Sequence, residues 1–260
     1  ISRKRVENFA EFLQNEGFKV YPYHAGLSKE VRERNQDRFI KEDGVIMVAT
    51  IAFGMGIDKP DVRFVCHMDL PKSMEAYYQE TGRAGRDGLD SDAWLVYGLG
   101  DVVQLRSFIN NSNAPDEQKR IEHKKLNSLL AYVETADCRR KVLLDYFNEK
   151  YEAPCNNCDT CIHHTETYDA TVEIQKILSC IFRVNKSAGR FGFGAANIIV
   201  ILQGKETDKI LKFGHNKLST FGIGKETDVF QWQSIIRQLA VMGFVEIDPA
   251  HLTISLTPEA

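Results

Sequence analysis

The sequence predicts an α/β domain built on a parallel sheet, followed by a helical region and then by a small α+β domain. Three observations carry this prediction. Apolar runs alternate with helical patterns over the first hundred residues, the strand-like runs stop near residue 101, and helices followed by a strand pair return after residue 171. Such alternation is typical of an open sheet, whose ligands bind beyond the carboxyl ends of the strands.

The first part contains elements whose ends are marked by particular residues. The apolar runs 45–49 and 64–68 are of the kind that a parallel sheet buries on both faces. Ser28 and Ser73 each stand where a side-chain cap begins a helix. The elements expected here are helices over 5–16, 28–41 and from 73, and strands over 19–23, 45–49, 64–68 and 93–97.

The rest of the chain is mainly helical. Helices are expected over 117–136, with Ile121, Leu129, Leu130 and Val133 facing inward, and over 138–147, before a polar linker at 163–169. Helices over 172–184, 195–202 and 228–242 then precede strands over 244–247 and 252–256. Three helices closed by a hairpin are the plan of a winged helix, a helix-turn-helix variant.

Composition excludes some classes of protein. The chain has 260 residues, of which 43% are hydrophobic and 27% charged, with a formal net charge of −3. Since no apolar run approaches the roughly 18 residues of a membrane span, no membrane contact is expected. The negative net charge means that any nucleic-acid contact must come from local patches. Because the chain starts at Ile1 and enters a helical pattern directly, we expect a fragment that lacks a first strand and an upstream domain.

Residues 77–88 are the most informative stretch. Arg83 and Arg86 lie three residues apart among Gly82, Gly85 and Gly88, after a short helical pattern. A guanidinium never deprotonates and matches phosphate oxygens in a bidentate manner, so this pair suits the transition state of phosphoryl transfer. The alternative is a surface turn with two solvated arginines.

Cys138, Cys155, Cys158 and Cys161 have the spacing C-x16-C-x2-C-x2-C. Four thiolates so spaced suit a structural, tetrahedral zinc ion in a reducing compartment. An iron–sulfur cluster and incidental cysteines are the alternatives. His163 and His164 follow closely enough to replace one ligand. Cys66 and Cys180 lie in apolar runs and are expected in the core.

A glycine-containing loop follows the strand expected at 45–49. Thr50 offers a hydroxyl, Gly54 and Gly56 permit close approach, and Asp58 can pair with Arg83, with Arg86 or with a ribose. Taken with residues 23–27 (Tyr-His-Ala-Gly-Leu), 56–60 (Gly-Ile-Asp-Lys-Pro) and 79–86 (Gln-Glu-Thr-Gly-Arg-Ala-Gly-Arg), the chain resembles the C-terminal motor domain of a superfamily 2 DNA helicase. The resemblance narrows to the RecQ family because of the Cys-Arg-Arg at 138–140, the cysteine cluster and the winged-helix pattern. Within that family, the compact cysteine spacing resembles that of the bacterial members.

The resemblance implies three parts: a second RecA-like helicase motor domain over 1–103, a helical zinc-binding module over 104–168 and a winged-helix DNA-binding domain over 169–260. It implies that His24, Gly26 and Thr50 line a single-strand DNA track and that Gly56 and Asp58 couple nucleotide state to DNA. Gln79, Arg83 and Arg86 would face the ATP phosphates, with Arg86 the preferred arginine finger and Arg83 the second choice. The four clustered cysteines would be the zinc ligands.

The expected function is that of part of a 3′–5′ ATP-dependent DNA helicase of repair and recombination, in the bacterial cytoplasm and associated with the nucleoid. No G-x-x-x-x-G-K-[ST] and no D-E-x-H box occurs, so ATP and magnesium would be shared with a first motor domain, and this chain alone is expected to be inactive. A non-enzymatic zinc and winged-helix DNA-binding adaptor is the alternative. A helicase acting on RNA is disfavoured by the winged-helix pattern.

The winged helix is expected to grip duplex DNA. Free amides at the helix start near Thr227 and Asp228 would contact phosphates. His251, in the expected wing, would stack at the DNA fork, where the duplex separates into single strands. The basic and hydroxyl side chains ahead of that helix are Lys212, His215, Lys217, Ser219 and Lys225, of which the lysines and Ser219 would also meet phosphates. The competing interpretation is a solvated basic face. Arg139 and Arg140 pair either with acidic side chains or with DNA.

Overall fold

The computed structural model describes residues 2–53, 57–163, 167–188, 192–248 and 251–260. The chain divides into two compact units, one made of residues 1–71 and 75–97 and the other of residues 72–74 and 98–260. The division of the sequence at 103 and 168 stays a proposal.

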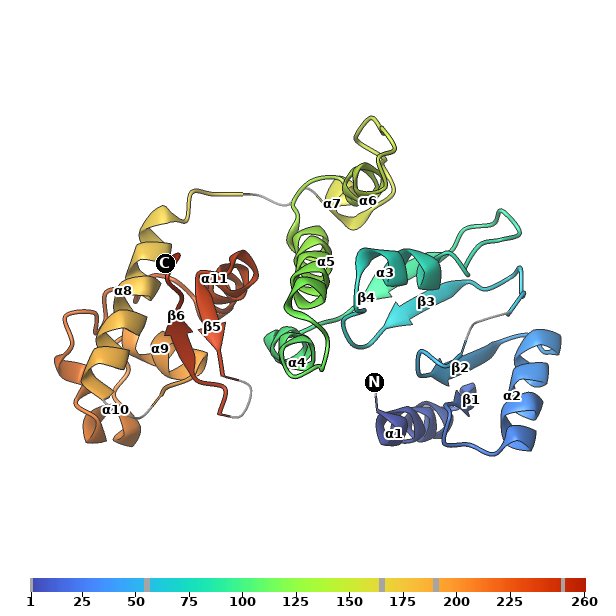
Figure 1. Cartoon of the computed structure of the whole chain (residues 1–260), viewed down its shortest axis with the longest axis horizontal. Coiled ribbons are helices and arrows are strands. Elements are labelled where there is room, and N and C mark those ends of the chain that lie inside the picture. Colours follow the sequence, from blue (N-terminus) through green and yellow to red (C-terminus); the bar gives the residue numbers. More distant parts are fainter. Residues whose placement is uncertain (1, 54–56, 164–166, 189–191, 249–250) are drawn as a thin grey trace. The chain divides into compact units, whose positions relative to one another are not determined.

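The first unit is the expected alternation of helices and parallel strands (Figure 1). Strand β1 (Lys19–Tyr23) pairs in parallel with β2 (Val45–Ala49), and β3 (Phe64–His67) with β4 (Asp92–Leu95). Helix α1 (Arg3–Asn15) packs on the first strand pair through a core of Val6, Ala10, Val20 and Val48. Helices α2 (Lys29–Lys41) and α3 (Met74–Thr81) complete the unit, and the Ser28 side chain caps α2 as expected by accepting from the Val31 amide.

Burial of the strands differs from the expectation. Phe64 and Trp94 are 47% and 63% exposed, and the Cys66 side chain, expected in the core, is exposed. Along β3 exposed residues alternate with partly buried ones, and Trp94 of β4 is the register partner of Cys66, so these residues share a face that the described residues do not cover. The apolar run therefore indicated a strand correctly, but not how many of its faces this unit buries.

The second unit begins with helix α4 (Leu99–Asn110), which the sequence pattern did not reveal. Helices α5 (Asp116–Glu134), α6 (Arg139–Tyr146) and α7 (Asp159–Ile162) follow. Leu129 and Leu130 are fully buried as expected, whereas Ile121 is 41% exposed. Ile121 lies in the first half of α5, whereas the buried residues of this helix, from Leu126 to Tyr132, lie in its second half.

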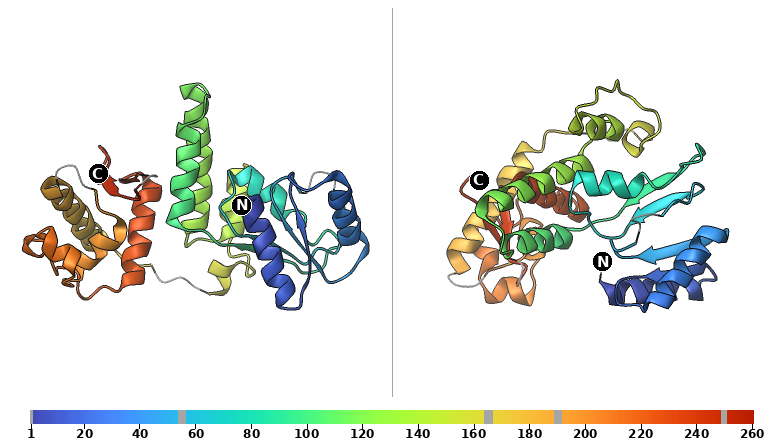
Figure 2. Two further views of the ribbon diagram at one scale, coloured as in Figure 1. Left: turned by 90° about the horizontal axis from the view of Figure 1, so that it is seen from below. Right: turned by 45° about the vertical axis from the view of Figure 1, so that its right-hand side comes forward.

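The C-terminal part has the three helices and the antiparallel hairpin of a winged helix (Figure 2). Helices α8 (Thr171–Ala188), α9 (Ala195–Leu202) and α11 (Val229–Met242) enclose one core with strands β5 (Val245–Ile247) and β6 (Ile254–Leu256). Helix α10 (Asp208–Lys212) and the 3₁₀ turn η1 (His215–Lys217) connect α9 to α11. None of the described helices has the length and apolar character needed to cross a membrane.

Candidate functional site

The arginine loop, residues 82–88, leaves the carboxyl end of α3 through a sharp turn. Gly85 has φ +65°, which favours glycine, and an added Cβ would lie 2.6 Å from Ser91 Oγ. Its amide donates to the Val62 carbonyl at 3.0 Å, and the Asp87 amide donates to the Pro60 carbonyl at 3.2 Å. The loop is therefore bound to residues 60–62, which lead out of the segment containing Asp58.

Arg86 lies at the surface of this loop. Its Nη1 is 3.2 Å from Asp58 Oδ1, and its Nε donates to the Gly82 carbonyl at 3.3 Å. The pairing of Asp58 with an arginine is thus confirmed. The Arg86 side chain is 39% exposed and that of Asp58 is 85% exposed, so solvent reaches both groups. A phosphate arriving from outside the unit can reach this guanidinium without any core rearrangement.

The other residues expected at the nucleotide differ in their accessibility. Gln79 is exposed on α3, and Arg83 is half-buried. Gly56 lies outside the described residues. Arg83 and Arg86 thus share one loop but not one environment, and Arg86 is the more accessible of the two.

His24 is placed differently from a residue that lines a DNA track. Its side chain is buried, with Nδ1 accepting from the Gly26 amide at 3.1 Å and Nε2 lying 3.1 Å from Glu7 Oε1. Because both ring nitrogens are engaged inside the unit, burial argues against a direct DNA contact and for a role in shaping residues 24–27. Thr50 is half-buried, and its Oγ1 accepts from the Ala52 amide at 3.4 Å.

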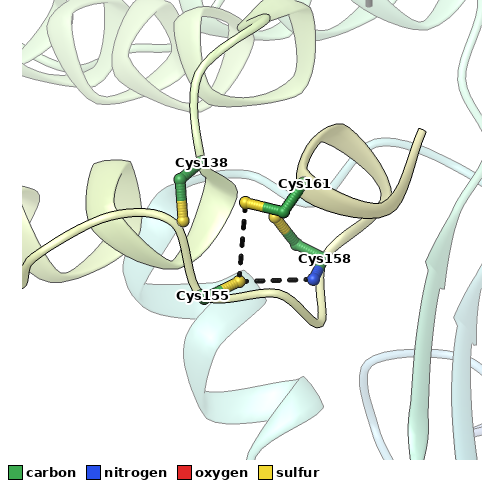
Figure 3. A group of neighbouring side chains, drawn as sticks. All are labelled: Cys138, Cys155, Cys158 and Cys161. Atoms are coloured by element: carbon green, nitrogen blue, oxygen red, sulfur yellow. Dashed lines mark hydrogen bonds between the residues drawn. The ribbon is translucent and has the colours of Figure 1, made fainter. Parts of the chain in front are cut away.

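The four cysteines expected to bind metal converge (Figure 3). Their Sγ atoms all lie within 4.8 Å of one another, and Cys155 Sγ and Cys161 Sγ are 3.9 Å apart. Zinc–sulfur bonds of about 2.3 Å in a tetrahedron place sulfurs about 3.8 Å apart, so the sulfur atoms fit one zinc ion. An iron–sulfur cluster would have to fit its own iron and sulfide atoms among sulfurs that are this close. The spacing of the four cysteine sulfurs therefore supports zinc as the bound metal.

Neighbouring residues orient the sulfurs. The Cys158 amide donates to Cys155 Sγ at 3.3 Å, and Cys158 begins α7. Burial disfavours the Cys158 thiolate, but hydrogen bonding at the sulfur, including that from the Arg139 amide, outweighs burial and lowers the pKa of Cys158 to about 6. Thr160 Oγ1 lies 3.3 Å from the same sulfur. Thr160 Oγ1 in turn donates to the Asp137 carbonyl at 2.8 Å, which ties α7 to the residue before Cys138. His163 is exposed and not part of the cluster, and His164 lies outside the described residues.

The two arginines after Cys138 have partners within the protein. Arg139 Nε lies 2.5 Å from Asp159 Oδ1, and Arg139 Nη1 donates to the Tyr132 carbonyl at 2.8 Å. The Arg140 guanidinium lies over the Tyr151 ring, 6.0 Å from its centroid. For Arg139, the structure supports the alternative in which it pairs with an acidic side chain. Through these contacts Arg139 joins α5 and α7 around the cysteine cluster.

The winged helix exposes part of the expected DNA-binding set, namely Lys212, Lys217, Ser219, Lys225 and His251. His215, which also lies ahead of the third helix, is fully buried. The expectation of free amides at the start of that helix is wrong. The Asp228 carboxylate accepts from the Phe230 and Gln231 amides at 2.7 and 3.0 Å, so these amides are taken and a negative charge occupies the helix start. Asp228 directly before the helix was the signal of a side-chain cap.

Three family models match consecutive parts of the chain. These are "Helicase conserved C-terminal domain" over residues 1–88, "RecQ zinc-binding" over residues 99–162 and "RQC domain" over residues 164–260. The chain belongs to the RecQ family of helicases. Its zinc-binding match contains all four clustered cysteines, and its helicase match contains the arginine loop.

Curated RecQ relatives match along most or all of the chain. The "ATP-dependent DNA helicase RecQ" proteins of Haemophilus influenzae and Pasteurella multocida are 45% and 43% identical over the whole chain. That of Bacillus subtilis is 38% identical over 95% of the chain. The chain spans only 41%, 40% and 41% of these relatives, respectively. It is the C-terminal part of a RecQ helicase core.

Proposed function

We propose that this RecQ chain supplies one face of an ATP site, a structural zinc module and a duplex-binding domain to a 3′–5′ DNA helicase. The observation that carries the proposal is Arg86, an exposed guanidinium on a loop held by backbone hydrogen bonds. In phosphoryl transfer catalysis consists mainly of positioning and charge stabilisation, and an arginine supplied from a second lobe stabilises the transition state.

The proposed reaction needs an upstream RecA-like domain to deliver ATP and magnesium. Closure of the two motor domains would bring Arg86 to the γ-phosphate, with Arg83 and Gln79 beside it. Hydrolysis would reopen the domains and move the single strand along residues near Thr50. The isolated chain is expected not to hydrolyse ATP.

The zinc module would act as a structural joint. Helix α6 has no fully buried residue, so the zinc–thiolate bonds are a main source of stability for α6, α7 and the loop between them. The winged helix would hold the duplex through exposed lysines that contact phosphates, which fixes position without reading sequence. The bacterial relatives support action in the bacterial cytoplasm, at the nucleoid.

Replacing Arg86 in the full-length protein tests the ATP-site assignment. Arg86→Ala is expected to lower kcat for DNA-stimulated ATP hydrolysis by about 10³-fold or more, while binding of ATP and of DNA stays within a few-fold. The matched control is Arg120→Ala, since Arg120 is an exposed arginine that also pairs with a carboxylate, Glu117. Hydrolysis at the control rate in Arg86→Ala would refute the finger assignment.

A further inference from the structure

Residues 58–63 run beside the arginine loop and are bonded to it at several points. The Gly85 and Asp87 amides donate to the Val62 and Pro60 carbonyls, and the Asp92 amide donates to the Arg63 carbonyl at 2.9 Å. Arg63 directly precedes β3. The arginine loop and the chain that follows it are therefore anchored to residues 60–63, which lead into β3.

The Arg63 side chain adds contacts that no backbone group supplies. Its Nη2 lies 2.5 Å from Asp87 Oδ2, its Nη1 donates to the Asp90 carbonyl at 3.1 Å and its Nε donates to the Asp61 carbonyl at 3.0 Å. All three nitrogens of one planar guanidinium are thus used, on acceptors from both segments. Lysine offers a point charge without this fixed fork and cannot reproduce the arrangement.

Asp87 links this clamp to the proposed finger. It is the direct neighbour of Arg86, and its second oxygen, Oδ1, accepts from the Leu89 amide at 3.1 Å. The hydrogen bond from Arg63 lowers the pKa of Asp87, so the carboxylate stays charged at neutral pH. Arg86 itself makes longer contacts, at 3.2 and 3.3 Å. The orientation of the finger thus depends on how firmly Asp87 is held.

We propose that Arg63 is a positioning residue for ATP hydrolysis, which locks Asp87 and thereby fixes the direction in which Arg86 leaves the loop. The inference rests on the proposed function of Arg86. Arg63 acts through Asp87 and need not touch the nucleotide. Loss of the clamp leaves the finger present but poorly oriented, and a misplacement of about 1 Å can lower a rate about 10²-fold.

The test uses the full-length protein at saturating single-stranded DNA. Arg63→Gln is expected to lower kcat for ATP hydrolysis about 10²-fold, with KM for ATP changed less than about threefold. Asp87→Asn removes the same ion pair from the other side and should give a loss of similar size, while Arg63→Lys keeps one charged contact and loses less. Arg5→Gln is the matched control, since Arg5 forms a 2.5 Å ion pair with Asp69 away from the loop.

The double variant Arg63→Gln/Arg86→Ala separates positioning from stability. Its rate should equal that of Arg86→Ala within about twofold, because no finger is left to orient. The proposal would be overturned if the double variant lost a further 10²-fold or so in kcat relative to Arg86→Ala. It would also be overturned if Arg63→Gln and Asp87→Asn both had normal kcat while Arg86→Ala was inactive. Full activity of Arg86→Ala would instead remove the proposed function itself.

Discussion

Arg86 and Asp58 form an ion pair across two loops of one unit, with Nη1 and Oδ1 3.2 Å apart. The sequence left Arg83, Arg86 and a ribose open as partners of Asp58, and the structure shows the contact with Arg86. Exposed pairs of this kind contribute about 0–1 kcal/mol, so the contact can orient the guanidinium but cannot keep it from a triphosphate. Asp58 therefore holds Arg86 only weakly at the surface of the unit.

Asp58→Asn should release Arg86 for phosphate. We expect the apparent KM for ATP of the full-length protein to fall by at most about fivefold, the equivalent of about 1 kcal/mol, with kcat unchanged within about twofold. Steady-state ATP hydrolysis measures both constants. A KM raised about tenfold or more would contradict this prediction and would indicate that the carboxylate binds the nucleotide directly.

Duplex binding should depend on the exposed lysines of the winged helix. Replacing Lys212, Lys217 and Lys225 together by Gln should weaken binding of blunt duplex to full-length protein. If all three contact phosphates, the slope of log K against log[salt] should become shallower by about 2.7. Fluorescence anisotropy at several salt concentrations measures this slope.

The control for the duplex-binding experiment removes three lysine charges outside the winged helix. Lys4, Lys41 and Lys150 are exposed lysines outside the winged helix, so their triple Gln variant should keep the parental slope. Equal slopes for both triple variants would mean that the winged-helix lysines are a solvated face and not a DNA contact.

Zinc should depend on each of the four clustered thiolates. Cys155→Ser is expected to lower bound zinc from one per chain to near zero, because Ser offers no thiolate, and to destabilise α6 and α7. Metal content is measured by atomic emission, and unfolding by circular dichroism. Cys66→Ser is the control, since Cys66 lies outside the cluster and is exposed, and it should retain zinc. Full zinc content in Cys155→Ser would exclude this ligand set.

Motifs with fixed spacing could be interpreted from the sequence, because short loops leave little geometric freedom. The cysteine cluster belongs to this class, as do the winged-helix elements, whose apolar periods are regular. Asp58 and Arg86 lie 28 residues apart, and the sequence alone did not decide between the possible partners of Asp58. What the sequence did not show depends on tertiary packing. His24 and His215 are polar, and only packing decides that their rings lie inside. Helix α4 has buried Val102 and Val103 but too weak an amphipathic pattern to stand out.

Arg63 shows another limit of sequence reasoning. It is one of many arginines, and the residue types around it do not distinguish a clamp from a solvated side chain. Its three acceptors are two carbonyls and one carboxylate, and the carbonyls leave no trace in the sequence. Only the path of the backbone at residues 61 and 90 reveals them.

Acidification should destabilise the winged helix through His215. The ring is fully buried, Asn197 Nδ2 lies 3.3 Å from its Nδ1, and the Phe193 ring is 4.5 Å away. Burial, with repulsion from Lys209, lowers the pKa of His215. A lowered folded-state pKa gives stability that is present above the unfolded value of about 6.5 and is lost as pH falls below it.

His215→Phe should remove this pH dependence. Urea unfolding of the full chain at pH 7.5 and pH 5.0 should show a smaller loss of unfolding free energy in the variant than in the parent. The comparison between proteins is needed because burial, with Arg106, also lowers the pKa of His123. His251→Phe, at an exposed site, should behave as the parent does. Equal losses in His215→Phe and the parent would refute the assignment.

The ion pair between Arg237 of α11 and Glu134 of α5 should couple the winged helix to the preceding helices. Nε and Oε1 are 2.5 Å apart, and the side chains are 32% and 13% exposed. Arg106 Nη2 lies 3.5 Å from the Val241 carbonyl on the same helix. Removing one charge leaves its partner poorly solvated, so Glu134→Gln and Arg237→Gln should each cost about 1–3 kcal/mol of unfolding free energy.

The double variant decides whether these losses come from the pair. If they do, Glu134→Gln/Arg237→Gln should cost less than the sum of the singles, with a coupling of about 0.5–3 kcal/mol in urea unfolding. The exposed pair of Lys141 and Asp145 within α6 provides the comparison and should couple by only about 0.3–0.5 kcal/mol. Additive losses at 134 and 237 would mean that each side chain stabilises its own helix, and that this ion pair does not couple the winged helix to α5.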